Sequence, residues 1–233
     1  SGNDYFVPIN HAEISQGGWL YYQSKFFEGV HAYATAGGSD LARFYDSPAN
    51  DEFVATPTYA ALYNTTYRQE YTHGFYNRAK YFEGAHAYAT AGGGDLARLY
   101  DSPADDEFYG DPEHGALYNP DYQEEYTSGF YNNAKFFEGV HAYATAGGSD
   151  EARLYGSAED DKLYANSIEV ALYRPGHYYN RAKHFEEVYA DAGAGGDDVA
   201  DLHDSPSSDL LQAEGNWARL SNAALDFLYE AAA

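Results

Sequence analysis

The feature that most constrains this chain is an internal repeat of 55 residues. Its best-preserved part is found at Lys25–Asp40, Lys80–Asp95, Lys135–Asp150 and, in a more divergent form, Lys183–Asp198. The last copy begins 48 residues after the third, because seven residues are missing between Tyr173 and Tyr178. A fixed period of this size is typical of repeat architectures, in which each unit buries its apolar face against the next.

A finer period of 18 or 19 residues lies inside the long repeat. Each step ends on an aromatic residue, and these are Tyr45, Tyr63, Phe82, Tyr100, Tyr118, Phe137, Tyr155 and Tyr173. Short alternating runs separated by Gly, Pro, Asp and Asn indicate strands and turns. We therefore predict an all-β fold, a right-handed parallel β-solenoid of the β-roll or β-helix type, with about 18 residues per coil and three coils per 55-residue repeat.

Each predicted coil holds two short strands and two turns. In the second repeat the strand pairs are 95–101 with 106–110, 115–119 with 124–127, and 133–137 with 140–145. We assign residues 1–233 to one array, with repeats at 25–79, 80–134 and 135–182 and partial repeats at 1–24 and 183–233. The sequence has no Met and starts at Ser1, so we expect it to be a piece of a longer chain.

The two faces of each predicted strand have different side chains. Because side chains alternate along a strand, Ala97 and Leu99 are expected to face the core. The aromatic residues that end each step are then expected to form an outer ladder, joined by His31, His86 and His141. Two interpretations stay open: the ladder only stabilises the sheet by ring stacking, or it is a contact surface for a partner chain, a neighbouring solenoid or a glycan.

The charge of the chain excludes one class of partner. There are 37 acidic and 13 basic residues, a formal net charge of -24, whereas a nucleic-acid partner requires a basic patch. No apolar run approaches the roughly 18 residues of a membrane span. The absence of Cys excludes disulfides and thiolate metal sites, and the 26 Tyr and 13 Phe residues argue against disorder.

Two segments carry a family resemblance. The run from Gly92 to Tyr100, which begins Gly-Gly-Gly-Asp, and the run from Ala104 to Gly110 resemble the RTX repeats of haemolysin-type calcium-binding β-rolls, although no complete nonapeptide occurs. The resemblance implies a secreted or cell-surface protein, and calcium as the one cofactor to expect, with no other required. Candidate calcium ligands are Asp101, Asp105, Asp106, Asp197 and Asp198, because Ca²⁺ prefers oxygen ligands.

The acidic pairs of this chain recur with the repeat, whereas catalysis needs one irregular site. We therefore predict a non-catalytic extracellular structural or assembly protein that presents a repetitive aromatic surface. It would polymerise or dock on a larger assembly, through its solenoid ends or its aromatic face. The alternative is a calcium- or glycan-binding adhesin module, and a third reading is a carbohydrate-active β-helix enzyme.

Overall fold

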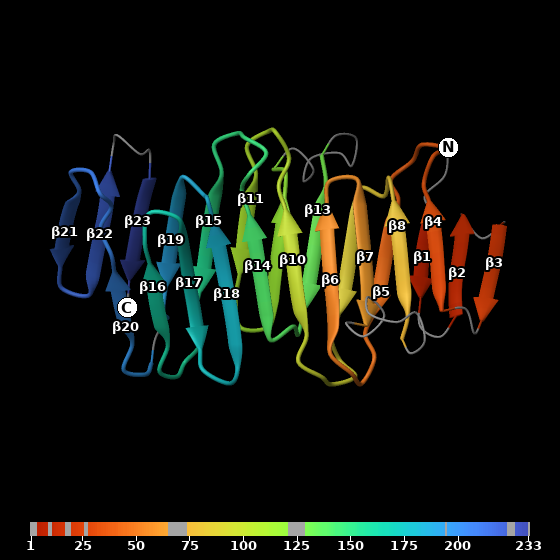
Figure 1. Cartoon of the computed structure of the whole chain (residues 1–233), viewed down its shortest axis with the longest axis horizontal. Coiled ribbons are helices and arrows are strands. Elements are labelled where there is room, and N and C mark those ends of the chain that lie inside the picture. Colours follow the sequence, from red (N-terminus) through yellow and green to blue (C-terminus); the bar gives the residue numbers. More distant parts are fainter. Residues whose placement is uncertain are drawn as a thin grey trace.

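Two β-sheets stacked face to face make up the described chain, with the strands running across the long axis (Figure 1). This computed structural model describes residues 4–8, 11–16, 20–25, 28–64, 74–120, 129–193, 195–222 and 227–232, with side chains for 28–64, 74–120, 129–193, 195–222 and 231. No helix occurs in these ranges, and hence none that is long and apolar enough to span a membrane.

The strands are short, mostly four to six residues. They are β1 (Asp4–Pro8), β2 (His11–Gln16), β3 (Leu20–Lys25), β4 (Gly29–Tyr33), β5 (Leu41–Tyr45), β6 (Asp51–Thr56), β7 (Tyr59–Asn64), β8 (Tyr76–Lys80), β9 (Gly84–Tyr88), β10 (Leu96–Tyr100), β11 (Glu107–Gly110), β12 (His114–Tyr118), β13 (Tyr131–Lys135), β14 (Gly139–Tyr143), β15 (Glu151–Tyr155), β16 (Lys162–Ala165), β17 (Glu169–Arg174), β18 (Tyr178–Lys183), β19 (Glu187–Asp191), β20 (Val199–Leu202), β21 (Leu210–Glu214), β22 (Trp217–Asn222) and β23 (Phe227–Ala232).

Each full repeat contributes five strands, four to one sheet and one to the other. In the second repeat, β9 lies in the 13-stranded sheet, β10 crosses to the ten-stranded sheet, and β11, β12 and β13 return to the first. In the third repeat the sheets are exchanged, since β14 and β16 to β18 lie in the ten-stranded sheet and β15 lies in the 13-stranded one. Successive repeats therefore alternate between the two sheets.

The last three strands of each repeat form an antiparallel meander that runs back toward the preceding repeat. The order in the 13-stranded sheet includes β15-β11-β12-β13-β9. The outer meander strands pair in parallel with single strands, β11 with β15 and β13 with β9, while β12 is antiparallel to both of its neighbours. The meander thus fills the space between two parallel strands of one sheet.

Parallel pairings slightly outnumber antiparallel ones among the described strands. Their register is regular: Ala97 lies beside Phe53 on one side and Val140 on the other, 44 and 43 residues away. The prediction of an all-β fold with parallel strands stacked in register is confirmed at this level. The right-handed sense of the path stays a prediction.

The predicted pairing of the 18-residue coils is wrong. The strand at 114–118, β12, lies antiparallel between β11 and β13 instead of parallel beside β10. The cause is a tight turn, in which Asp111 and His114 exchange backbone hydrogen bonds of 2.8 and 3.3 Å and reverse the chain within one sheet. The predicted strand at 124–127 lies outside the described residues.

The core between the sheets is built from alanines and a few large apolar side chains. The inward prediction is confirmed for Ala97 and Leu99, both fully buried. The largest fully buried side chains include Phe44, Phe53 and Phe108. Alternation of large and small residues across the two inner faces lets the thin stack close without voids.

Phe82 and Phe137 belong to this core, so their predicted place in the outer ladder is wrong: their exposed fractions are 7% and 4%. Each follows a residue with positive φ, Tyr81 at 63° and Phe136 at 64°. This left-handed residue turns the chain at the end of the strand, so that the next side chain points inward. The Phe137 ring packs 6.2 Å from that of Phe53.

Candidate functional surfaces

Tyrosine rings stack in pairs on the outer faces of both sheets. Tyr100 and Tyr143 on the ten-stranded sheet have ring centroids 4.9 Å apart and planes inclined by 11°. On the 13-stranded sheet the equivalent pair is Tyr45 and Tyr88, at 5.2 Å and 16°. Both pairs arise because the parallel register places the last residues of neighbouring strands side by side.

A second set of ring contacts joins the meander strands. The tyrosine pairs are Tyr63–Tyr76 at 5.6 Å, Tyr118–Tyr131 at 5.5 Å and Tyr173–Tyr179 at 5.3 Å. A histidine of the neighbouring parallel strand meets each pair edge-on, as His31 on Tyr76, His86 on Tyr131 and His141 on Tyr179. Each repeat therefore has the same His–Tyr–Tyr group on its outer face.

Arginine extends this group on the ten-stranded sheet. Arg78 Nη2 lies 3.0 Å from His31 Nδ1 and donates to the hydroxyl of Tyr33 at 2.7 Å, with the guanidinium carbon 5.7 Å from the Tyr33 ring centroid. The same contacts recur in Arg181, His141 and Tyr143, at 3.1, 2.9 and 5.6 Å. Such cation–π contacts contribute about 0.5–1 kcal/mol each at exposed sites.

The histidines of the outer faces are neutral near pH 7. Burial, with the positive charges of Arg181 and Arg98, lowers the pKa of His141 to about 4. Burial and the charges of Arg43 and Lys135 do the same for His86. A neutral ring leaves one nitrogen as an acceptor, which suits the hydrogen bond from Arg181.

The structure divides the predicted ladder between two opposite faces. Tyr45, Tyr118, Tyr155 and His86 lie on the 13-stranded sheet, while Tyr63, Tyr100, Tyr173, His31 and His141 lie on the ten-stranded sheet. Tyr155 is 37% exposed, whereas Tyr63 is 2% exposed beneath its neighbours. The predicted single continuous ladder is therefore wrong, because the path alternates between sheets.

Sequence reasoning missed the partner of each ring. Tyr88, Tyr143 and Tyr109 complete outer pairs, as Tyr109 lies 5.2 Å from Tyr155. Tyr88 and Tyr143 each stand 43 residues after their partners. That constant spacing was the signal that could have found these two.

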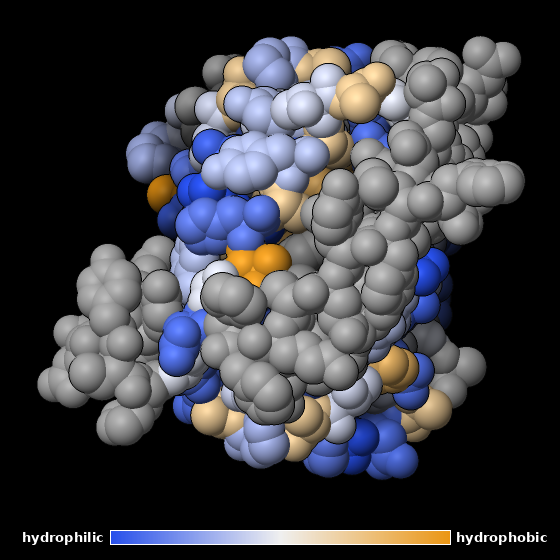
Figure 2. Space-filling model, turned by 90° about the vertical axis from the view of Figure 1, so that its right-hand side faces the viewer, coloured by the Kyte–Doolittle hydropathy of each residue, from blue (hydrophilic) through white to orange (hydrophobic). Residues whose placement is uncertain are grey.

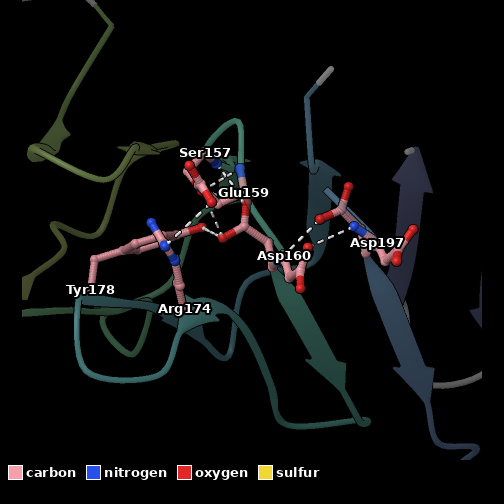
Figure 3. A network of polar contacts seen from close by, with 8 residues as sticks. Ser157, Glu159, Asp160, Arg174, Tyr178 and Asp197 are labelled. Atoms are coloured by element: carbon pink, nitrogen blue, oxygen red, sulfur yellow. Dashed lines mark hydrogen bonds and ion pairs between the residues drawn. The ribbon is translucent and has the colours of Figure 1, made fainter. Parts of the chain in front are cut away.

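Buried aspartates organise the turns between sheets. Ser102 donates to Asp106 Oδ2 through its backbone N–H at 2.6 Å and its hydroxyl at 2.8 Å, and Asn119 Nδ2 donates to Oδ1 at 3.3 Å. The third repeat, which is shorter, uses Tyr178 in place of the asparagine: its hydroxyl donates to Asp161 Oδ1 at 2.8 Å (Figure 3).

The same turns are tied to the following repeat. The backbone N–H of Asp106 donates to Asp150 Oδ1 at 2.8 Å, as that of Asp51 does to Asp95 Oδ1 at 2.7 Å. Burial raises the pKa of Asp95 and of Asp150 to about 7, with a further rise from nearby acids such as Glu138 beside Asp95. These two carboxyl groups are thus close to half-protonated at neutral pH.

The predicted calcium ligands are placed as follows. Asp101 Oδ2 accepts the Ala146 N–H at 2.7 Å, Asp105 Oδ1 that of Ser149 at 2.9 Å, and Asp198 Oδ1 that of Asp161 at 2.8 Å. Asp106 belongs to the serine turn, and the Asp197 N–H donates to Asp160 Oδ1 at 2.9 Å (Figure 3). Within the described ranges, no three or more His, Asp or Glu side chains are grouped to hold a metal ion. Calcium stays a prediction.

Asp95→Asn is expected to stabilise the protein at pH 8 by about 1–3 kcal/mol. The folded-state pKa of Asp95 is raised from 3.8 to about 7, so the wild type loses stability as pH rises between these values. The gain should therefore grow from about pH 4 to pH 7 and then level off. Asparagine keeps an oxygen for the Asp51 N–H.

Urea unfolding of both proteins at pH 5 and pH 8 measures this gain. Comparison at one pH cancels the opposite contribution of His86 and His141, whose lowered pKa values remove stability as pH falls below 6.5. A variant less stable than wild type at pH 8 would mean that the Asp95 carboxylate is held ionised in the fold.

Comparison with protein-family models, with curated proteins and with solved structures finds no match to this chain.

Proposed function

We propose that this chain is a non-catalytic structural module that acts outside the cell or on its surface. Its two outer faces present repeated groups of tyrosine, histidine and arginine to a protein partner, which includes further copies of the chain. It works by polymerising or by docking on a larger assembly. The RTX-like turns support the extracellular assignment by resemblance.

One observation carries this proposal: the same partly exposed group recurs along one face. Arg78 with Tyr33 and Arg181 with Tyr143 hold matching positions on the ten-stranded sheet, two repeats apart. Tyr and Arg are the residues that contribute most to protein interfaces. Their fixed geometry lowers the conformational entropy lost on binding.

The acidic residues support a structural role over catalysis. Asp51, Asp106 and Asp161 each accept bonds from their own serine turn, and the bonding pattern repeats. Catalysis requires a site where nucleophile, base and substrate pocket break the regularity. The end-on view in Figure 2 shows a largely hydrophilic described surface with separate hydrophobic residues.

Removing two stacked rings should weaken assembly with little loss of stability. The double change Tyr100→Ser with Tyr143→Ser is expected to reduce association at least tenfold by sedimentation, because two anchors of about 1–2 kcal/mol each are lost from the contact. The melting temperature should fall by only a few degrees. Tyr81→Asn, at an exposed turn residue with positive φ, is the matched control. Unchanged association of the double variant would contradict the proposal.

The adhesin alternative is supported by acids that neighbouring repeats bring together. Asp160 and Asp197 are exposed and joined by one hydrogen bond. Thermal melting with Ca²⁺ and with EDTA separates the two functions: a rise of ten degrees or more in Ca²⁺ would favour the calcium module. Glycan arrays test the glycan-binding form directly.

A further inference from the structure

The end of the molecule formed by β20 and β21 exposes a core position. Leu211 is 61% exposed, whereas the equivalent residues of the three preceding repeats, Phe53, Phe108 and Leu163, are 0%, 1% and 6% exposed. Leu210 and Val199 beside it are 56% and 54% exposed. These three residues, which we call the end face, form the densest group of exposed large apolar side chains among those described.

The local structure at Leu211 matches that of the other repeats. Ser205 donates to Asp209 through its backbone N–H at 3.1 Å and its hydroxyl at 2.9 Å, and Asn222 donates to Asp209 at 3.0 Å. Ser102, Asp106 and Asn119 make the same bonds before Phe108. Leu211 is therefore built as a core residue, and what differs is its cover.

A cavity opens between the sheets at the same end. Its volume is about 190 Å³, and its lining includes Leu163, Leu172, Ala190, Ala218 and Ala231. A cavity of roughly 150 Å³ accommodates a benzene ring, so this one fits a phenyl side chain.

In earlier repeats a phenylalanine fills the corresponding place. Phe137 packs 6.2 Å from Phe53, and Phe185 packs 6.1 Å from Phe108. Leu163 stands where Phe53 and Phe108 stand, but its wall faces the cavity. Both phenylalanines precede a Glu and the first strand of a repeat. The cavity therefore matches the aromatic residue that opens a repeat.

The sheet edges at this end match the other end of the molecule. β20 ends the ten-stranded sheet and β21 ends the 13-stranded one, while β4 is the opposite edge of the ten-stranded sheet. β20 is the second strand of its repeat and β4 the first, the same types that pair as β10 and β14. Exposed apolar edges of this kind are templates for strand addition.

We propose that the end face binds the first repeat of a second copy of this chain. In this contact β4 of the second copy pairs in parallel with β20, and β5 pairs with β21. By sequence, Phe27 of the second copy is the aromatic residue that enters the cavity. The proposal deepens the proposed function, on which it rests, by naming one contact of the assembly.

Charge supports this occupant. The β10–β14 register, applied to β20 and β4, places Asp201 beside His31 of the second copy, where Arg98 lies beside His141 within the chain. Arg78, bonded to that His31, brings a positive charge to the junction. The end face is acidic, through Asp197, Asp198, Asp201 and Asp204, so the two ends attract each other despite the net charge of -24.

The contact exchanges one meander for another. β1 to β3 of the second copy hold the place next to β5 that β21 to β23 of the first copy would take. The β1–β5 pairing spans two residue pairs, against five for β5 with β9. The resident meander is thus held by fewer ladder bonds than the pairing on the other side of β5, which makes the exchange feasible.

The test compares self-association of the full chain with that of two end-face variants. Leu211→Asp places a charge on an exposed residue, and Ala218→Phe fills the cavity from within. Ile168→Asp, at an equally apolar residue that is 48% exposed on the β16–β17 turn, is the matched control. Sedimentation velocity over a concentration series is expected to show at least tenfold weaker association for both end-face variants and no change for the control.

A labelled synthetic peptide with the sequence of residues 135–150 serves as the probe of the site itself. It should bind the wild-type chain saturably, lose binding to Leu211→Asp, and bind at least tenfold more weakly when its own Phe137 is replaced by Ala. Assembly that persists in both end-face variants, or a peptide that does not bind, would overturn this inference and leave the aromatic faces as the contact. A wild-type chain that stays monomeric would overturn the proposed function as well.

Discussion

Phe108→Ala is expected to lower the free energy of unfolding by about 3–5 kcal/mol, because it removes a fully buried ring and leaves a cavity. Phe108 is 1% exposed, lies between the sheets and packs 6.1 Å from Phe185 of the following repeat. The change therefore weakens both its own repeat and the junction with the next. Urea unfolding followed by circular dichroism measures the loss.

Leu211→Ala is the matched control for that change. Leu211 holds the position of Phe108 two repeats later but is 61% exposed. Its truncation should cost less than about 0.5 kcal/mol in the monomer. Equal losses at the two positions would show that the end face is covered, against the structure described above.

Gly148→Ala is expected to cost at least about 3 kcal/mol, because it combines a steric clash with backbone strain. A Cβ at Gly148 would overlap the carbonyl oxygen of Ala104 and lie 2.6 Å from its carbonyl carbon, at a φ of 118°. The turn of one repeat lies directly against the backbone of the repeat before it, so neither side has a flexible side chain to move. Thermal melting and urea unfolding both report this loss.

The neighbouring Gly147→Ala separates the two causes. Gly147 also has positive φ, at 102°, but a Cβ there would meet nothing within 4 Å. It should cost about 1–2 kcal/mol from backbone strain. A Gly148→Ala variant no less stable than Gly147→Ala would contradict the close packing of successive turns.

Strand positions and their inward faces followed from the sequence because alternation is local. Ala97 and Leu99 face inward and Arg98 outward whatever strand lies beside them, since the period of two belongs to the backbone. The turns at Ser102 and Gly147 were equally visible, because Gly, Pro and Asp have few other uses at such spacing. These signals establish the all-β class without reference to pairing.

Pairing was not predictable from the same period. An 18-residue step fits a full solenoid coil, but it also fits the advance from one strand to the next but one through a hairpin. The two-residue turns Pro57-Thr58 and Gly215-Asn216 join antiparallel strands and were the available signals for hairpins. Because strand length and turn length are similar in both arrangements, periodicity alone did not separate them.

The aromatic surface was predicted in kind but not in arrangement. Tyr100 was expected to face outward and does, yet its stacking partner Tyr143 comes from a strand 43 residues away in the parallel register. Phe137 was misplaced because a positive φ at Phe136 interrupts the alternation, and aromatic residues seldom adopt that conformation. Tertiary register and local strain are the two pieces of information that the pattern did not contain.

Electron microscopy of the purified chain over a range of concentrations tests the central claim most directly, that this repeat array works by regular association with other protein. We predict elongated particles that join into ordered assemblies, sensitive to the Tyr100→Ser with Tyr143→Ser variant. Dispersed single particles at every concentration, with and without a candidate partner, would contradict the structural role and direct attention to calcium and glycan binding.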